Sequence, residues 1–195
     1  MSTRWQLTGV ADDYDARWRA LQEAGQNIHG EADLVEALLG GAGHSVLDAG
    51  CGTGRVAIEL SRRGFTVAGV DADRAMLAAA KDKAPQLRWA HADLAAAHWP
   101  PVLPGRVDLA LLAGNVMIFL APDTERRVLA NLAARLAPGG LLVAGFSLRP
   151  GQLTLEDYDA MAAAAGLMPA GRWATWDRQP YRGGDYAVSA HRRPE

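Results

Sequence analysis

The feature of this sequence with the clearest chemical potential is an acid followed by three alternating glycines, in the stretch VLDAGCGTG at residues 46–54. Asp48 closes a short apolar segment that predicts a buried strand, and Gly50, Gly52 and Gly54 predict a tight turn into a helix. Glycine suits such a turn because the backbone there adopts positive φ and can approach a ligand closely. The free N–H groups at the start of the following helix add partial positive potential. The pattern therefore predicts a small-molecule site with a carboxylate beside it.

The carboxylates that follow the predicted strands indicate what kind of molecule this site binds. A phosphate would gain nothing from Asp48, whereas a cationic ammonium group would. Asp71 ends the next predicted strand, 65–70, and an acid about 20 residues after such glycines can accept hydrogen bonds from both ribose hydroxyls. Asp93 follows a third predicted strand, 87–90, and could accept the exocyclic N–H of adenine, cap the turn that begins at Leu94, or do both.

Five segments together resemble the class I S-adenosylmethionine-dependent methyltransferases, in family order and spacing. They span about half of the chain: VLDAGCGTG at 46–54, VAGVDAD at 67–73, HADL at 91–94, VDLALLAGNV at 107–116 and LAPGGLLVAGF at 136–146. The resemblance implies an α/β fold with a doubly wound, seven-stranded, mostly parallel, Rossmann-like sheet and an N-terminal helical cap. It also implies that S-adenosyl-L-methionine is the cofactor.

The resemblance assigns parts of the cofactor to parts of the chain. Asp48 and the glycine loop would hold the methionine end, Asp71 the ribose, and Asp93 with Leu94 the adenine. The residues expected to bind the cofactor are Asp48, Ala49, Gly50, Gly52, Asp71, Ala72, Met76, Asp93, Leu94, Ala113 and Asn115. No catalytic residue and no metal site is assigned.

The order of predicted elements fits one domain of 195 residues. Residues 1–45 predict the helical cap, with Tyr14 as the aromatic side chain expected nearest the acceptor and a polar loop at 27–31. From 46 to 147 strands and helices alternate, which predicts a parallel sheet that forms the cofactor-binding core. Within it, Asp73 is predicted to cap a helix, and a turn at 138–140 to precede a strand at 141–146.

Residues 148–195 predict a C-terminal helix and a β-hairpin, with strands around 171–177 and 186–191.

The amino-acid composition limits the kinds of partner and the cellular compartment that we expect for this protein. With 20 basic against 22 acidic residues and a net charge of −2, nothing suggests nucleic-acid binding. No apolar run approaches the roughly 20 residues of a membrane helix, and acids near the N-terminus occupy the place of a signal peptide's apolar run. The single cysteine, Cys51, permits no intrachain disulfide, and we expect it to be a small packing residue. We therefore expect a cytoplasmic protein, whose oligomeric state stays open.

The predicted reaction is direct, metal-independent, in-line methyl transfer to a small-molecule acceptor. Gly114-Asn115-Val116-Met117 replaces the N-P-P-Y type of tetrapeptide that nucleic-acid amino methyltransferases use. Two alternatives remain open. An NAD(P)-dependent oxidoreductase would place its third glycine at position 55, which is Arg55 here. A non-catalytic S-adenosylmethionine-binding module would keep every cofactor residue.

Overall fold

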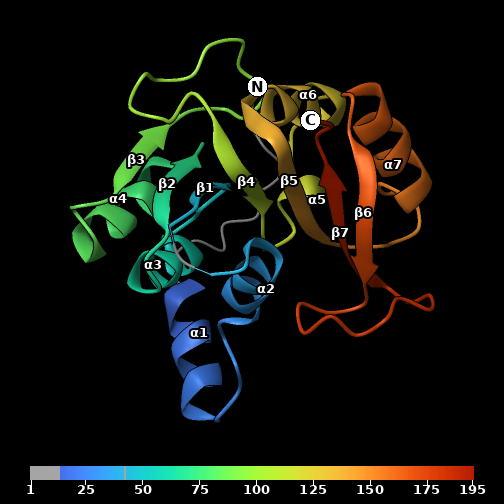
Figure 1. Ribbon diagram of the computed structural model, residues 1–195. Coiled ribbons are helices and arrows are strands. Elements are labelled where there is room, and N and C mark those ends of the chain that lie inside the picture. The colour runs from blue at the N-terminus through green and yellow to red at the C-terminus, as the bar shows by residue number, and fades with distance from the viewer. Residues whose placement is uncertain (1–13, 42) are drawn as a thin grey trace.

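The computed structural model describes residues 14–41 and 43–195, and its centre is a seven-stranded sheet of order β3-β2-β1-β4-β5-β7-β6 (Figure 1). Strands β1 to β5 run parallel to one another, whereas β7 is antiparallel to both β5 and β6. This confirms the prediction of a seven-stranded, mostly parallel sheet. The strands are β1 Ser45–Ala49, β2 Thr66–Asp71, β3 Arg88–His91, β4 Val107–Leu112, β5 Leu136–Ser147, β6 Met168–Trp173 and β7 Tyr186–Arg192.

Helices cover both faces of the sheet. Buried apolar residues of α2, α3 and α4 share one cluster with the strands, and those of α5, α6 and α7 share another. Neighbouring strand residues such as Val46 and Leu47 belong to opposite clusters, because side chains alternate across a strand. The helices are α1 Tyr14–Glu23, α2 Gly30–Leu39, α3 Arg55–Arg62, α4 Arg74–Lys83, α5 Val116–Phe119, α6 Glu125–Arg135 and α7 Leu155–Ala164.

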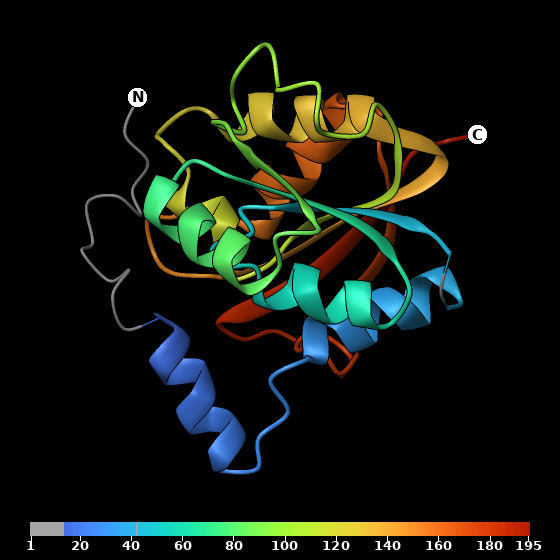
Figure 2. The same ribbon diagram turned by 90° about the vertical axis from the view of Figure 1, so that its left-hand side faces the viewer.

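The described part of the N-terminal cap consists of α1 and α2. Helix α2 packs beside α3 through buried Leu34 and Val35. Figure 2 shows α1 projecting from the rest of the molecule, with its C-terminal end farthest away. The predicted loop at 27–31 is shorter than expected, because Gly30 and Glu31 already belong to α2.

Two strands differ from their predicted bounds. Strand β5 begins at Leu136 and runs through Pro138, Gly139 and Gly140, where the sequence predicts only a turn. Its N-terminal part pairs with Val107 of β4, and the register then shifts before Leu109 pairs with Leu141. Strand β6 begins at Met168, three residues before the predicted segment, as the antiparallel partner of β7.

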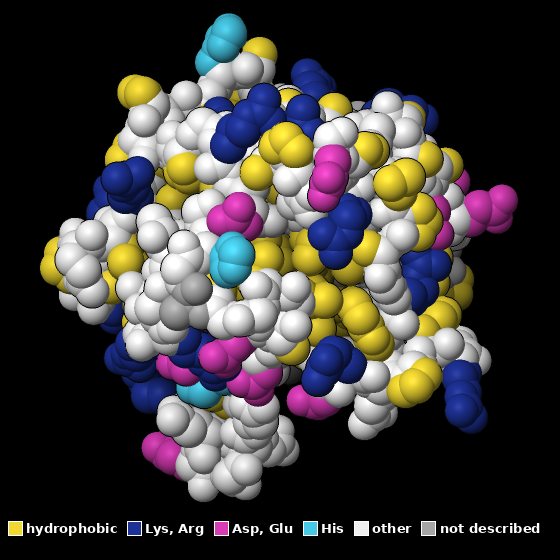
Figure 3. Space-filling view, in the orientation of Figure 1, with side chains coloured by type: hydrophobic (Ala, Val, Ile, Leu, Met, Phe, Trp, Pro, Cys, Tyr) yellow, Lys and Arg dark blue, Asp and Glu magenta, His cyan; other side chains and the backbone are white. Residues whose placement is uncertain are grey.

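The surface shows no concentration of one charge on the face drawn in Figure 3. Lys and Arg side chains are scattered there among Asp and Glu, and hydrophobic side chains gather near the centre of the face. Among the described helices, none combines the length and hydropathy that a bilayer-spanning segment requires.

Candidate active site

A pocket with a cavity volume of about 110 Å³, partly open to solvent, lies where the carboxyl ends of the parallel strands meet. This is where open α/β sheets bind ligands. The sheet order places the end of β3 at one side of the pocket, β2 and β1 in the middle, and β4 at the other side. The lining residues are Asp48, Gly50, Cys51, Gly52, Arg55, Val56, Asp71, Ala72, Asp73, Met76, Asp93, Leu94, Ala113, Gly114, Val116, Phe119 and Leu120.

Asp48 is the most buried charged group in the pocket wall, with 1% of its surface exposed. The backbone N–H of Ala57, in the first turn of α3, donates to its carboxylate. Its Oδ2 atom has no hydrogen-bond partner among the described residues. Burial raises the pKa of the Asp48 carboxyl to about 7; the charge of Arg55 opposes this rise, and the charges of Asp71 and Glu31 add to it. A buried carboxylate oxygen without a partner is costly, so this atom is suited to a cationic ligand group.

Asp71 connects the ends of β2 and β1. Its Oδ2 accepts the backbone N–H of Gly52 at 2.7 Å, and its Oδ1 accepts that of Asp73 at 2.8 Å. Burial raises the pKa of Asp71, and the N–H donors of Asp73 and Gly52 oppose that rise. Each carboxylate oxygen can accept more than one hydrogen bond, so both retain capacity toward the pocket.

The glycine loop is bonded to the protein itself rather than left open for an anion. Gly50 and Cys51 donate their N–H groups to the Val70 carbonyl, and Gly54 donates to that of Cys51. Gly52 donates to Asp71, and the Asp48 carboxylate takes one N–H at the start of α3. The positive potential expected at the start of α3 is reduced, because the Asp48 carboxylate accepts at least one of its N–H groups. A loop of this kind does not cradle a phosphate.

The β3 side of the pocket combines an acid with apolar side chains. Asp93 caps its own turn, because its Oδ1 accepts the N–H of Ala95 at 2.8 Å. Asn131 of α6 stabilises the same turn by donating to the Leu94 carbonyl at 2.8 Å. Leu94 and Met76 are only 5% and 4% exposed, and both residues line the pocket. The capping role predicted for Asp93 is confirmed.

The β4 side of the pocket is formed by a sharp turn and a short helix. Gly114 and Asn115 both adopt positive φ, 64° and 67°, so the chain turns back over the sheet into α5. Val116, Phe119 and Leu120 then line the pocket. Gly50 is required opposite them, because a Cβ there would lie 2.5 Å from Cγ2 of Val116.

The described part of the cap, residues 14–41, contributes no residue to the pocket lining. It instead contacts residues of the glycine loop and of the pocket wall. Asp15 accepts the hydroxyl of Thr53 in the glycine loop at 2.5 Å and pairs with Lys83 of α4 at 2.8 Å. Arg55 pairs with Glu31 and lies over the ring of Trp18. The side chain of Tyr14, which we predicted to lie nearest the acceptor, falls outside the described residues.

Comparisons with known proteins agree with this geometry. The family described as Methyltransferase domain matches residues 46–140. An uncharacterized methyltransferase of Mycobacterium tuberculosis is 34% identical over 166 residues, which cover 82% of this chain and 76% of that protein. The chain is an S-adenosylmethionine-dependent methyltransferase. The crystal structure of a TehB-like SAM-dependent methyltransferase from Corynebacterium glutamicum superposes on it with a TM-score of 0.83 and 35% identity, covering 95% of this chain and 98% of the other.

A third relative of the methyltransferase is much longer than the matched region. The trans-aconitate 2-methyltransferase of Delftia acidovorans is 33% identical over 124 residues, which cover 63% of this chain but only 45% of that enzyme. Family membership confirms S-adenosylmethionine as the cofactor. The alternative of an NAD(P)-dependent oxidoreductase is wrong, in agreement with a glycine loop whose N–H groups are already bonded.

The structure of the methyltransferase brings nine of the eleven predicted cofactor residues to the pocket wall. Ala49 and Asn115 do not line it. Ala49 is fully buried in the apolar cluster on the α5, α6 and α7 face. Asn115 points its side chain toward the neighbouring strand, where its Oδ1 accepts the N–H of Ser147 at 2.7 Å. Both positions support the pocket from outside it.

Several wall residues were not predicted as cofactor residues. Asp73 was assigned only a capping role, which is confirmed because its Oδ1 accepts the N–H of Ala75 at 2.8 Å. Cys51 is 8% exposed, and burial raises the pKa of its thiol well above the usual range, in agreement with the predicted packing role. The sequence contains one signal for Arg55 as a wall residue, because this charged residue directly follows the glycine turn. The others are Val56, Gly114, Val116, Phe119 and Leu120.

Within the described part of the chain, no group of three or more His, Cys, Asp or Glu side chains is placed to hold a metal ion.

Proposed function

We propose that this methyltransferase transfers a methyl group directly to a small-molecule acceptor, without a metal ion. The single observation that carries the proposal is the buried Asp48 carboxylate, which lines a small-molecule pocket and whose Oδ2 has no hydrogen-bond partner among the described residues. An ammonium group would supply the missing donor and the compensating charge. S-adenosylmethionine carries such a group on its methionine end.

The remaining wall residues would hold the rest of the cofactor in the order of the strands. Asp71, with spare acceptor capacity on both oxygens, would receive the ribose hydroxyls. Asp93 with Leu94 and Met76 would surround the adenine, one supplying an acceptor and the others apolar contact. Ala72, Ala113, Gly50 and Gly52 complete the wall between these groups.

The chemistry assigned to the chain is alignment and exclusion of water. When bound, S-adenosylmethionine supplies an electrophilic methyl group on a sulfonium. The residues of the pocket fix the orientation of that group relative to the acceptor, and proximity of this kind supplies roughly 7–11 kcal/mol in favourable cases. Val116 and Phe119 of α5, with the adjacent Leu120, are apolar and restrict water at the β4 side.

The charges of the wall favour an uncharged or amine-bearing acceptor over a polyanion. Among the described residues, four aspartates line the pocket, and the one guanidinium there, that of Arg55, is already paired with Glu31. A tricarboxylate such as trans-aconitate, for which the Delftia relative is named, would meet uncompensated negative charge here. The acceptor would enter at the β4 side, because the other strand ends are assigned to the cofactor.

Calorimetry followed by turnover tests the proposal. The protein should bind S-adenosylhomocysteine and show no comparable affinity for NADH. A panel of amines, alcohols and tricarboxylates, assayed with S-adenosylmethionine in the presence of EDTA, should give turnover on an amine or alcohol. Methylation of the tricarboxylates alone would contradict the acceptor class. Activity that EDTA abolishes would contradict the metal-independent step, and binding with no turnover on any acceptor would favour a non-catalytic module.

A further inference from the structure

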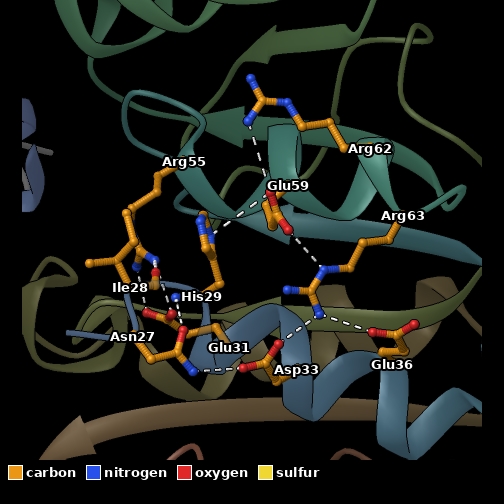
Figure 4. A network of polar contacts seen from close by, with 10 residues as sticks. All are labelled: Asn27, Ile28, His29, Glu31, Asp33, Glu36, Arg55, Glu59, Arg62 and Arg63. Atoms are coloured by element: carbon orange, nitrogen blue, oxygen red, sulfur yellow. Dashed lines mark hydrogen bonds and ion pairs between the residues drawn. The ribbon is translucent and has the colours of Figure 1, made fainter. Parts of the chain in front are cut away.

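Arg55, the first residue of α3, connects the pocket wall to both helices of the cap (Figure 4). Its guanidinium donates to both carboxylate oxygens of Glu31, at 3.0 and 2.5 Å, and to the carbonyl oxygen of Ile28. Its Cζ lies 3.7 Å from the ring centroid of Trp18 on α1. One side chain therefore contacts α1, the segment before α2, and α2 itself.

The Arg55–Glu31 pair is withdrawn from solvent, since the two side chains are only 10% and 8% exposed. Charges in such a position act on their neighbours with little screening by water or salt. The bidentate geometry uses the planar fork of arginine, which a lysine cannot reproduce.

A second arginine shows that the pair is not needed merely to attach α2 to α3. Arg63 donates to Asp33 at 2.7 Å and to Glu36 at 2.9 Å across the same interface, and to Glu59 of its own helix at 2.9 Å. In Figure 4 the contacts of Arg63 lie beside those of Arg55, and Asn27–Asp33 and His29–Glu59 contacts lie between them. Arg63 does not line the pocket, whereas Arg55 does, together with Asp48.

The charged groups around Asp48 come from several elements. Among the described residues, the main cation that acts on its carboxyl is Arg55 of α3, and the main anions are Asp71 of β2 and Glu31 of α2. The buried thiol of Cys51 is adjacent in the loop. Tyr186 of β7 lies near the pair, and burial raises the pKa of its phenol well above the usual range, so it stays neutral.

We propose that Arg55 and Glu31 form a positioning pair for Asp48: Arg55 stabilises the ionised carboxylate that receives the cofactor's ammonium, and Glu31 fixes and partly balances the guanidinium. The inference rests on the proposed function, in which Asp48 contacts that ammonium. Neither residue touches the reacting atoms. The pair couples cofactor binding to the docking of residues 28–31, because Arg55 lines the same pocket as Asp48 and its guanidinium also holds the Ile28 carbonyl and Glu31.

Removing either partner should shift the pH dependence of cofactor binding in opposite directions. The test measures the dissociation constant of S-adenosylhomocysteine by calorimetry from pH 5.5 to 8.5. In the unaltered protein, affinity should rise with pH to a plateau as Asp48 ionises. Arg55→Gln should move the midpoint up by about one pH unit, with affinity about tenfold weaker below it. Glu31→Gln should move the midpoint down, because it leaves the positive charge of Arg55 unbalanced.

Two control variants separate this role from a structural one. Arg63→Gln should lower the melting temperature but leave the midpoint in place. Arg55→Lys keeps the charge and loses the fork, so it should restore the midpoint even if the protein is less stable. If Arg55→Gln does not fold, Arg55→Lys and Glu31→Gln still decide the direction of the shift.

Asp48→Asn distinguishes failure of this inference from failure of the proposed function. This variant should abolish the pH dependence. If it does, but Arg55→Gln and Glu31→Gln shift the midpoint in the same direction or not at all, the positioning role is wrong and the role of Asp48 stands. If Asp48→Asn keeps the original pH dependence, both are wrong.

Discussion

The carboxylate of Asp71 accepts the backbone N–H of Gly52 at 2.7 Å, and this bond joins the end of β2 to the glycine loop after β1. The other oxygen holds the N–H of Asp73 at the start of α4. A residue that sequence reasoning assigns to the ribose therefore also shapes the loop that lies beside it. A substitution of Asp71 should therefore affect both the cofactor site and the loop.

Asp71→Asn should weaken cofactor binding and lower stability together. The amide of Asn keeps one oxygen acceptor, but its NH₂ group cannot accept the second backbone N–H. The protein therefore loses one hydrogen bond to a charged group, which contributes about 1.5–3 kcal/mol. We expect at least tenfold weaker binding of S-adenosylhomocysteine and a lower melting temperature of the unliganded protein. An unchanged melting temperature would show that the loop does not depend on this carboxylate.

Asp48→Asn should stabilise the unliganded protein while it weakens cofactor binding. The pKa of Asp48 is raised to about 7 in the folded protein, so the stability associated with its neutral form is present below pH 3.8 and is lost as the pH rises through 7. A neutral amide avoids that loss. Urea unfolding at pH 5 and pH 8 should show a gain from the substitution that is larger at pH 8. A loss of stability at pH 8 would contradict the assigned burial cost.

Asp15→Ala should weaken cofactor binding through the glycine loop. The substitution removes the hydrogen bond to Thr53 and the ion pair with Lys83. Because one such hydrogen bond contributes about 1 kcal/mol, we expect a several-fold increase in the dissociation constant of S-adenosylhomocysteine. Lys83→Gln is the matched control, since it breaks only the more exposed ion pair and should leave affinity nearly unchanged.

Trp89→Ala should be among the most destabilising substitutions outside the pocket wall. The indole is 7% exposed, packs against Gly54 and Gly69, and donates its Nε1–H to the Ala84 carbonyl at 2.8 Å. Removing it leaves a cavity beneath the glycine loop at a cost of about 3–5 kcal/mol, measurable by urea unfolding. Val102→Ala, at a position 44% exposed, should change stability by less than about 0.5 kcal/mol.

His191→Phe should remove a sensitivity of the protein to mild acid. His191 is 1% exposed on β7, with its Nε2 3.2 Å from Asp159 and its ring 5.3 Å from that of Tyr158. Burial lowers the pKa of His191 below its ordinary 6.5, so the unfolded chain binds the proton more readily and stability falls as the pH drops through 6.5. Melting temperatures between pH 5 and 7.5 should fall less steeply in the variant. Substitution of the exposed His98 by Gln should leave the slope unchanged.

Sequence alone determined the parts of this protein that depend on short-range patterns. Continuous apolar runs predict central strands, alternation with helices predicts a parallel sheet, and acids after strands predict where the ligand lies. Asp48, Asp71 and Asp93 converge as predicted, because the carboxyl ends of parallel strands meet at one edge of the sheet. Asp73 caps α4 because capping depends only on residues within one turn.

The tertiary structure alone decided which groups remain available for a ligand. The glycine loop N–H groups are consumed by partners as distant as Val70 and Asp71, and no local pattern shows this. Asn115 is directed toward Ser147 of β5 instead of the pocket, through a contact 32 residues apart in sequence. Arg55 and Glu31, 24 residues apart, become a buried pair only after α2 packs on α3. Burial, charge pairing and hydrogen-bond saturation are properties of the packed chain, and they determine what Asp48 can bind.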